Sequence, residues 1–236
     1  MADRNNEKNW KASFKLWFLG KHDKELYKKT ITLNLIILVG TLVISILLFS
    51  VPFSFYLHQI SFLGSTYWNP NGFLVFNIGF IIIGILLIPH CLFFYKYLLP
   101  DIKMFSRLSV FFLLIASVGL SLVGVFPSSG NYTLHITAAV LAFGGIAFSM
   151  IFMLFPLLKK IKRKEPWPSP KLVLILFLPL FIIIIFTAIA VGIPVVNNFP
   201  ASMYNEPPEL WALCEWLIAF TGMFWFFGIL YSRIYQ

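Results

Sequence analysis

Four polar residues inside long apolar stretches of the chain could do chemistry together. Asn77, Ser121, His135 and Glu215 each lie a few residues from one boundary of an apolar run. Polar side chains are costly inside a hydrocarbon layer, so their presence there points to a functional site. Glu215 is the only carboxylate within any of these runs, and with His135 it could act as an acid–base pair.

Two interpretations of His135 and Glu215 stay open. In the first, the two side chains pair, satisfy each other's hydrogen bonds and lock two helices together. In the second, they floor an outward-facing pocket for a polar headgroup, with Glu215 and His135 as base and acid or as orienters of a water. The catalytic candidates are Glu215 and His135, and the binding candidates are Asn77, Ser61, Ser121, Asn69 and Trp216.

Metal, haem and nucleotide sites find little support in the chain. One His and one Glu with neighbouring amides make a poor ligand set for zinc. A haem held by two imidazoles would need His58 and His135 at one depth, which is the weakest of the alternatives. Gly-rich phosphate loops and nucleophile-elbow patterns are missing from the sequence. We therefore expect no metal and no cofactor.

The elements that must position these residues are membrane spans. A hydrocarbon core ~30 Å thick requires ~20 apolar residues per helix. Six runs satisfy this requirement, at about 31–55, 73–94, 108–126, 136–158, 172–196 and 210–231. The predicted fold is all-α, a polytopic six-helix transmembrane bundle over residues 31–236 that follows a basic N-terminal segment over residues 1–30.

The distribution of basic residues predicts the orientation of this bundle. All 18 Lys and Arg residues precede the first run, follow the last, or lie between runs two and three or four and five. Cytoplasmic loops retain Lys and Arg, so we expect both termini in the cytoplasm. The protein itself is expected in the plasma membrane or in an endomembrane. The basic residues behind the formal net charge of +9 then lie next to the anionic membrane surface. Since the membrane accounts for this charge, it argues against nucleic acid as a partner.

The N-terminal segment has the pattern of an amphipathic helix. Trp10, Phe14, Trp17 and Phe18 recur at helical spacing, and lysines alternate with them. Such a helix lies in the plane of the membrane surface with its aromatic side in the headgroup boundary.

The spacing of small residues predicts which way the candidate side chains point. His135 shares a helical face with Ala138, Ala142, Gly145 and Ser149, and small residues allow another helix to approach closely. At a rise of ~1.5 Å per residue, Asn77, Ser121 and Glu215 lie roughly 6–8 Å inside the outer boundary. The four polar groups are therefore expected in one layer of the outer half.

Several short motifs resemble a known family. They are ISFLG at residues 60–64, WNPNG-x-LVFN-x-G from 68, GVFP from 124, H-x-x-A-x-x-x-AF from 135 and CEW at 214–216. The pattern is similar to the six-helix DRAM, Frag and Sfk membrane proteins and to a related prokaryotic domain family of unknown function. The resemblance implies family positions at Ser61, Gly64, Asn69, Pro70, Asn77, His135, Glu215 and Trp216. It also implies a link to membrane-lipid organisation, lipid-anchor remodelling or autophagy.

The sequence favours a membrane protein that binds membrane lipids in an outward-facing polar pocket, with modification or redistribution of those lipids as open extensions. Whether it is an enzyme is left open by the residues. A small-solute transporter and a structural or scaffolding membrane protein are the alternatives. The inner halves of the runs are almost wholly apolar, which disfavours a polar path through the bundle.

Overall fold

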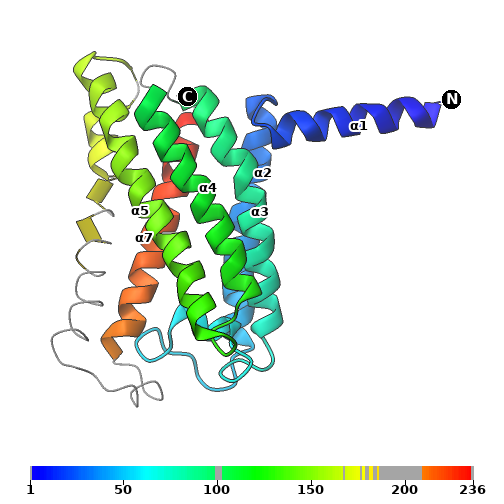
Figure 1. Cartoon of the computed structure of the whole chain (residues 1–236), viewed down its shortest axis with the longest axis vertical. Coiled ribbons are helices and arrows are strands. Elements are labelled where there is room, and N and C mark those ends of the chain that lie inside the picture. The colour runs from blue at the N-terminus through cyan, green and yellow to red at the C-terminus, as the bar shows by residue number, and fades with distance from the viewer. Residues whose placement is uncertain are drawn as a thin grey trace.

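A computed structural model shows a bundle of long helices lying side by side (Figure 1). It describes residues 2–98, 103–166, 168–175 and 209–234, and positions 177, 178, 181, 182 and 185. The elements are α1 (Ala2–Phe18), α2 (Lys24–Leu47), η1 (Ile60–Gly64), α3 (Phe73–Leu98), α4 (Lys103–Val125), α5 (Tyr132–Lys162) and α7 (Glu209–Ile234). All regular structure in these ranges is helical, which confirms the predicted fold class.

Five of the helices are long and apolar enough to cross a membrane: α2, α3, α4, α5 and α7. They correspond to the first four predicted runs and the sixth. The predicted run at 172–196 lies largely outside the described residues. The helices on either side of it, α5 and α7, respectively end and begin at opposite ends of the bundle (Figure 1).

Helix α2 begins seven residues earlier than the apolar run that predicted it. Its N-cap residue is Asp23, whose Oδ1 accepts a hydrogen bond from the Leu26 backbone N–H at 2.9 Å. Side-chain caps satisfy the free amides at a helix start, so a helix begins at its cap rather than where hydropathy rises. Residues 24–30 therefore extend α2 beyond the apolar run.

Small residues allow the neighbouring helices to approach closely. A Cβ on Gly145 of α5 would lie 2.8 Å from the Phe112 carbonyl oxygen and the Ala116 nitrogen of α4. One turn further along the same interface, the hydroxyl groups of Ser109 and Ser149 form a hydrogen bond, with their oxygens 2.8 Å apart. Packing between spans depends on such close contacts, because lipid competes equally for apolar side chains.

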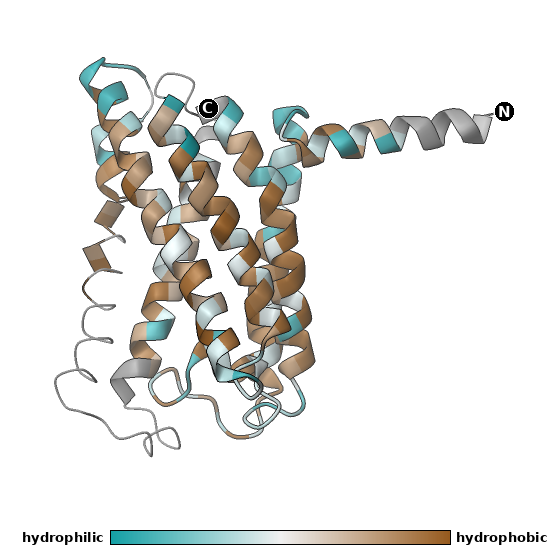
Figure 2. Ribbon diagram, viewed as in Figure 1, coloured by the Kyte–Doolittle hydropathy of each residue, from teal (hydrophilic) through white to brown (hydrophobic). Residues whose placement is uncertain are grey.

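The outer surface of the bundle is apolar along its length, while polar residues gather at its two ends (Figure 2). We call one end the basic end: it carries the start of α2 and α4 and the last turns of α3 and α5, with Lys24, Lys96, Lys103 and Lys159. We call the other the loop end: it holds residues 48–72 and 126–131, which contain no Lys, Arg, Asp or Glu.

Candidate functional site at the loop end

The segment between α2 and α3 folds against the loop end of the bundle and contains η1. Asn69 fixes it there. Its buried side-chain amide donates to the Ser45 carbonyl at 3.1 Å and to the Leu63 carbonyl at 2.9 Å, and its Oδ1 accepts from the Gly72 N–H. Asn69 thus ties the end of α2, the end of η1 and the turn before α3 into one unit.

Asn77 holds the same segment from the first turns of α3. Its Nδ2 donates to the Gly64 carbonyl at 3.0 Å, while its Oδ1 is buried without a hydrogen-bond partner in the described structure. A Cβ on Gly64 would meet both the Asn77 side chain and the Phe76 ring, so glycine is required at that position. Asn77 therefore contacts this segment through only the nitrogen of its side-chain amide.

Glu215 reaches this segment from α7. Ser61 Oγ donates to Glu215 Oε2 at 3.4 Å. Free amides and positive dipole character gather at the first turn of a helix, so a carboxylate is stabilised there. The half-buried Glu215 therefore joins the first turn of η1 to α7 through the Ser61 hydroxyl.

Trp216, the next residue, holds the loop just before η1. Its indole Nε1–H donates to the His58 carbonyl at 2.8 Å. Its ring lies edge-on to the rings of Phe53 and Phe55, with centroids 5.8 and 4.8 Å away. Trp216, Phe53 and Phe55 thus form an aromatic cluster against the loop that leads into η1.

His135 lies in the first turn of α5 and is buried. Its Nδ1 is 2.8 Å from the Phe126 carbonyl oxygen, which can only accept, so Nδ1 donates. Nε2 has no partner among the residues that the structure describes. The interaction closes the turn between α4 and α5, whose Ser128 hydroxyl in turn donates to the Ser61 carbonyl at 3.1 Å.

Ser121 belongs to the interface between α3 and α4 rather than to this loop. Its hydroxyl oxygen lies 3.3 Å from the carbonyl oxygens of both Ile81 and Ser117, which share its single hydrogen. A Cβ on Gly84 would collide with the Ser121 side chain, which places the two helices in close contact there.

The predicted site residues are therefore joined mostly through the loops. Ser61 contacts Glu215 with its hydroxyl and Ser128 with its carbonyl, and the turn that holds Ser128 is closed by His135. In the described part of the chain, no hydrogen bond or ion pair joins His135 directly to Glu215. The carboxylate and the imidazole are linked through Ser61 and the α4–α5 turn.

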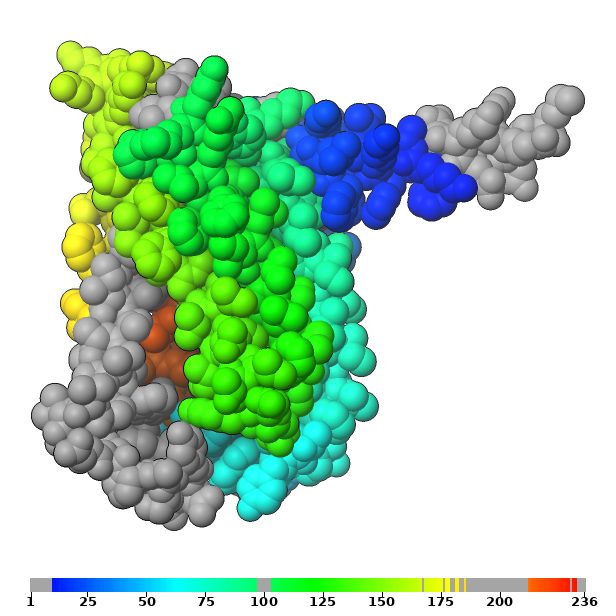
Figure 3. All heavy atoms as spheres, viewed as in Figure 1, coloured from blue at the N-terminus to red at the C-terminus, as the bar shows by residue number. Residues whose placement is uncertain are grey.

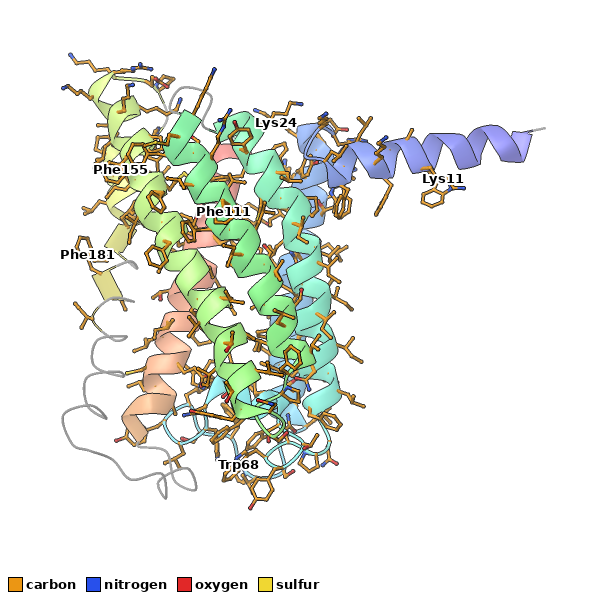
Figure 4. All side chains as sticks on the ribbon, in the orientation of Figure 1. Lys11, Lys24, Trp68, Phe111, Phe155 and Phe181 are labelled. Atoms are coloured by element: carbon orange, nitrogen blue, oxygen red, sulfur yellow. The ribbon has the colours of Figure 1, made fainter. Side chains whose placement is uncertain are left out.

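The sequence did not point to several residues of this site: Gln59, Phe53, Phe55 and Ser128. Gln59 Oε1 lies 3.3 Å from Ser61 Oγ and shares the single hydroxyl hydrogen of Ser61 with Glu215. The aromatic richness of residues 49–56 was a usable signal, because an aromatic cluster next to a loop with no charges must pack against something. Trp68, labelled in Figure 4, marks this end of the molecule and stacks on Phe62 with ring centroids 4.8 Å apart.

The arrangement offers a carboxylate, a hydroxyl and aromatic faces, but no cation. Among the residues with described positions, His, Cys, Asp and Glu side chains form no group of three or more that could hold a metal ion. A carboxylate can accept hydrogen bonds from hydroxyl groups and attract ammonium groups, and ammonium groups are also attracted to the faces of aromatic rings.

The chain was compared with known families, curated proteins and solved structures. The model of the family described as Frag1/DRAM/Sfk1/Cwh43P N-terminal domain matches residues 30–232. No curated protein and no solved structure matches. The matched range includes every helix of the bundle and all of the loop end, and it leaves out α1.

Proposed function

The chain belongs to the Frag1/DRAM/Sfk1/Cwh43P N-terminal domain family, and on that premise we propose that it binds membrane lipids at the loop end through Glu215, and redistributes or modifies them. The observation that carries the proposal is the position of this carboxylate. It stands in a membrane-spanning helix, half-buried, in contact with the Ser61 hydroxyl, and the next residue of the helix, Trp216, packs on Phe53 and Phe55. Ionisable groups in such positions are kept at a cost and mark ligand sites.

The chemistry around Glu215 favours headgroups that carry an ammonium or hydroxyl group. Phosphate recognition relies on Arg, Lys or several converging amides. Loop segments 48–72 and 126–131 contain no Lys or Arg, so they offer no cation to a phosphate. Glu215 can attract an ammonium group or accept from hydroxyls, and the exposed ring of Phe55, which packs on the buried Trp216, offers a face to a methylated ammonium.

We propose further that the basic end faces the cytoplasm. The support is the collection of Lys and Arg residues at that end, which cytoplasmic loops retain. The loop end and Glu215 then face the outside of the cell or the lumen of an organelle. The lipids taken up would come from that leaflet.

Native mass spectrometry tests the lipid proposal. The purified protein is released from vesicles containing equal amounts of phosphatidylcholine, phosphatidylethanolamine and phosphatidylglycerol. We expect retention of the two ammonium-bearing lipids over phosphatidylglycerol, and a loss of that preference of about ten-fold in Glu215→Gln. Gln keeps the shape and a hydrogen-bond acceptor for Ser61 but removes the charge.

Glu209→Gln makes the same chemical change at the first residue of α7 and is the matched control. Its lipid preference should equal that of the wild type. Equal retention of all three lipids by the wild type and by Glu215→Gln would overturn the proposal. Solute flux through liposomes that depends on Glu215 would then favour the transporter alternative.

A further inference from the structure

Helix α1 extends sideways from the basic end of the bundle, with its axis roughly perpendicular to the spans (Figure 1). It lies outside the family match and opposite the Glu215 site. Seventeen residues give it a length of about 25 Å at the helical rise. It lies at the level where the spans end, which is where a membrane has its headgroup layer.

The junction with the bundle fixes the direction of α1. Trp17 is buried, its Nε1–H donates to Thr30 Oγ1 at 3.3 Å, and its backbone carbonyl accepts from the Tyr27 hydroxyl. Thr30 Oγ1 also lies 3.1 Å from Nε2 of His90 in α3. Helix α1 is therefore attached by a buried polar contact rather than by a free linker.

Gly20 completes the junction. Its φ is +70°, a conformation that glycine adopts without strain. A Cβ at this position would lie 2.5 Å from the Phe93 nitrogen of α3. The turn between α1 and α2 is thus pressed directly onto the α3 backbone, which restricts how α1 can move.

The same junction shows which face of α1 turns towards the spans. Trp17 packs against His90, which lies eight residues before the end of α3, about 12 Å inside it at the helical rise. Trp10 and Phe14 lie seven and three residues before Trp17 and so share its face. The side chains of Trp10 and Phe14 are 57% and 54% exposed. They are therefore directed towards the level of the apolar spans, and Figure 3 shows atoms of this segment (blue) projecting to that side.

Lysines flank the aromatic face. Lys11 Nζ lies 5.8 Å from the centre of the Trp10 ring, and Lys15 follows one turn later. Further towards the N-terminus, Lys8 lies three residues before Lys11 and Arg4 lies four residues before Lys8, whereas Glu7 stands one i, i+4 step before Lys11. Cations next to an aromatic face at the headgroup level are placed to meet phosphates, whose charge is opposite.

We infer that α1 is a held membrane-surface helix that binds anionic phospholipids in the leaflet at the basic end. The aromatic face of Trp10 and Phe14 enters the boundary between headgroups and acyl chains, and Lys11 and Lys15 contact lipid phosphates. This site is separate from the Glu215 site in place, in charge and in the leaflet that it faces.

Spin labels on the full-length protein in vesicles test the depth of α1. Cysteines are placed at Phe14, on the aromatic face, and at Leu16, which points away from it and is also exposed. The native Cys91 and Cys214 are buried, so they contribute little labelling. We expect the label at position 14 to collide mainly with oxygen and the label at 16 mainly with a water-soluble nickel complex. Equal exposure of both labels to the nickel complex would overturn the inference.

The charge requirement is tested by native mass spectrometry from phosphatidylcholine vesicles with and without phosphatidylserine. Lys11→Gln with Lys15→Gln should lower the enrichment of phosphatidylserine about five-fold or more, since each surface lysine contributes about that factor. Lys162→Gln with Lys171→Gln removes the same charge from another part of the basic end and should reduce it less. If the α1 pair has no larger effect than this control, binding of anionic lipid by α1 is refuted even where the depth result holds. The results expected for α1 stay the same if the lipid preference that depends on Glu215 is not found.

Discussion

Most of the polar side chains at the loop end form hydrogen bonds with backbone groups of the loops and do not line open space. Asn69 is the clearest case, because both hydrogens of its buried amide are used on carbonyls of two different segments. Asn77 and Trp216 do the same for Gly64 and His58. The reason is general: a loop that packs against a bundle carries backbone groups that must find partners.

Replacement of Asn69 by Asp should therefore be costly. Asp keeps the shape but places a carboxylate oxygen against the carbonyls of Ser45 and Leu63, so two donors are lost and a charge is buried. We expect a loss of about 3 kcal/mol or more in unfolding free energy, measured as a fall in thermal unfolding temperature in detergent. Asn71→Asp, two residues along and exposed, makes the same chemical change and should shift stability little. Equal losses in both variants would contradict the bracing role of Asn69.

Asn34 poses the opposite case. It is fully buried in α2, and both its Nδ2 and its Oδ1 have no hydrogen-bond partner in the described structure. An unsatisfied buried amide costs about 1–3 kcal/mol, so Asn34→Leu, which has the same branching and the same number of side-chain heavy atoms, should raise the unfolding free energy, by less than that amount because its methyl groups are larger. Asn34→Ala controls for loss of the amide without filling the space. Destabilisation by Leu equal to that by Ala would mean that the amide is satisfied in the membrane.

At the scale of elements, hydropathy predicted which segments are helices, and the caps decided where they begin. The run at 73–94 and helix α3 start at the same residue, whereas α2 begins at Lys24 because Asp23 caps it. The amphipathic spacing of Trp10, Phe14 and Trp17 predicted α1. The sequence could not show that Trp17, on the same face, docks against Thr30 and His90, since this depends on contacts with α2 and α3.

The candidate site was predicted less well than the helices. Depth along straight helices placed Glu215 and His135 in one layer, which suggested a direct pair. The structure inserts η1 and the α4–α5 turn into that layer, so that Ser61 meets Glu215 and the Phe126 carbonyl meets His135. A loop that folds back onto its bundle has no periodicity, so its position cannot be predicted from spacing.

Two adjacent glycines of α5 provide a test of the contact with α4. A Cβ on Gly145 would lie 2.8 Å from backbone atoms of α4, whereas one on Gly144 meets nothing within 4 Å. Alanine is favoured over glycine in a helix by ~1 kcal/mol, so Gly144→Ala should be neutral or stabilising. Gly145→Ala forces the two helices apart and should cost about 1–3 kcal/mol. Thermal unfolding of both variants decides it, and equal behaviour would show that the helices do not approach this closely.

For the whole molecule, the two ends of the bundle differ in charge and in construction. One end carries lysines and the attached helix α1, and the other carries uncharged loops held by buried amides and by the contact of Ser61 with Glu215. The two proposed lipid sites therefore fall in opposite leaflets. An ammonium- or hydroxyl-bearing headgroup fits the loop end, and phosphate fits the basic end.

This assignment depends on the orientation of the bundle, which accessible cysteines can measure. Tyr67 is 77% exposed at the loop end, and the exposed Ser169 follows the end of α5 by seven residues at the basic end. If the basic end is cytoplasmic, Tyr67→Cys should react with a membrane-impermeant maleimide on intact cells, or on sealed organelles from within. Ser169→Cys should then react in the intact cell only after permeabilisation, and the buried native cysteines give the wild type little background. The reverse pattern would invert the orientation and assign the anionic-lipid contacts of α1 to the outer leaflet, where anionic phospholipids are scarce.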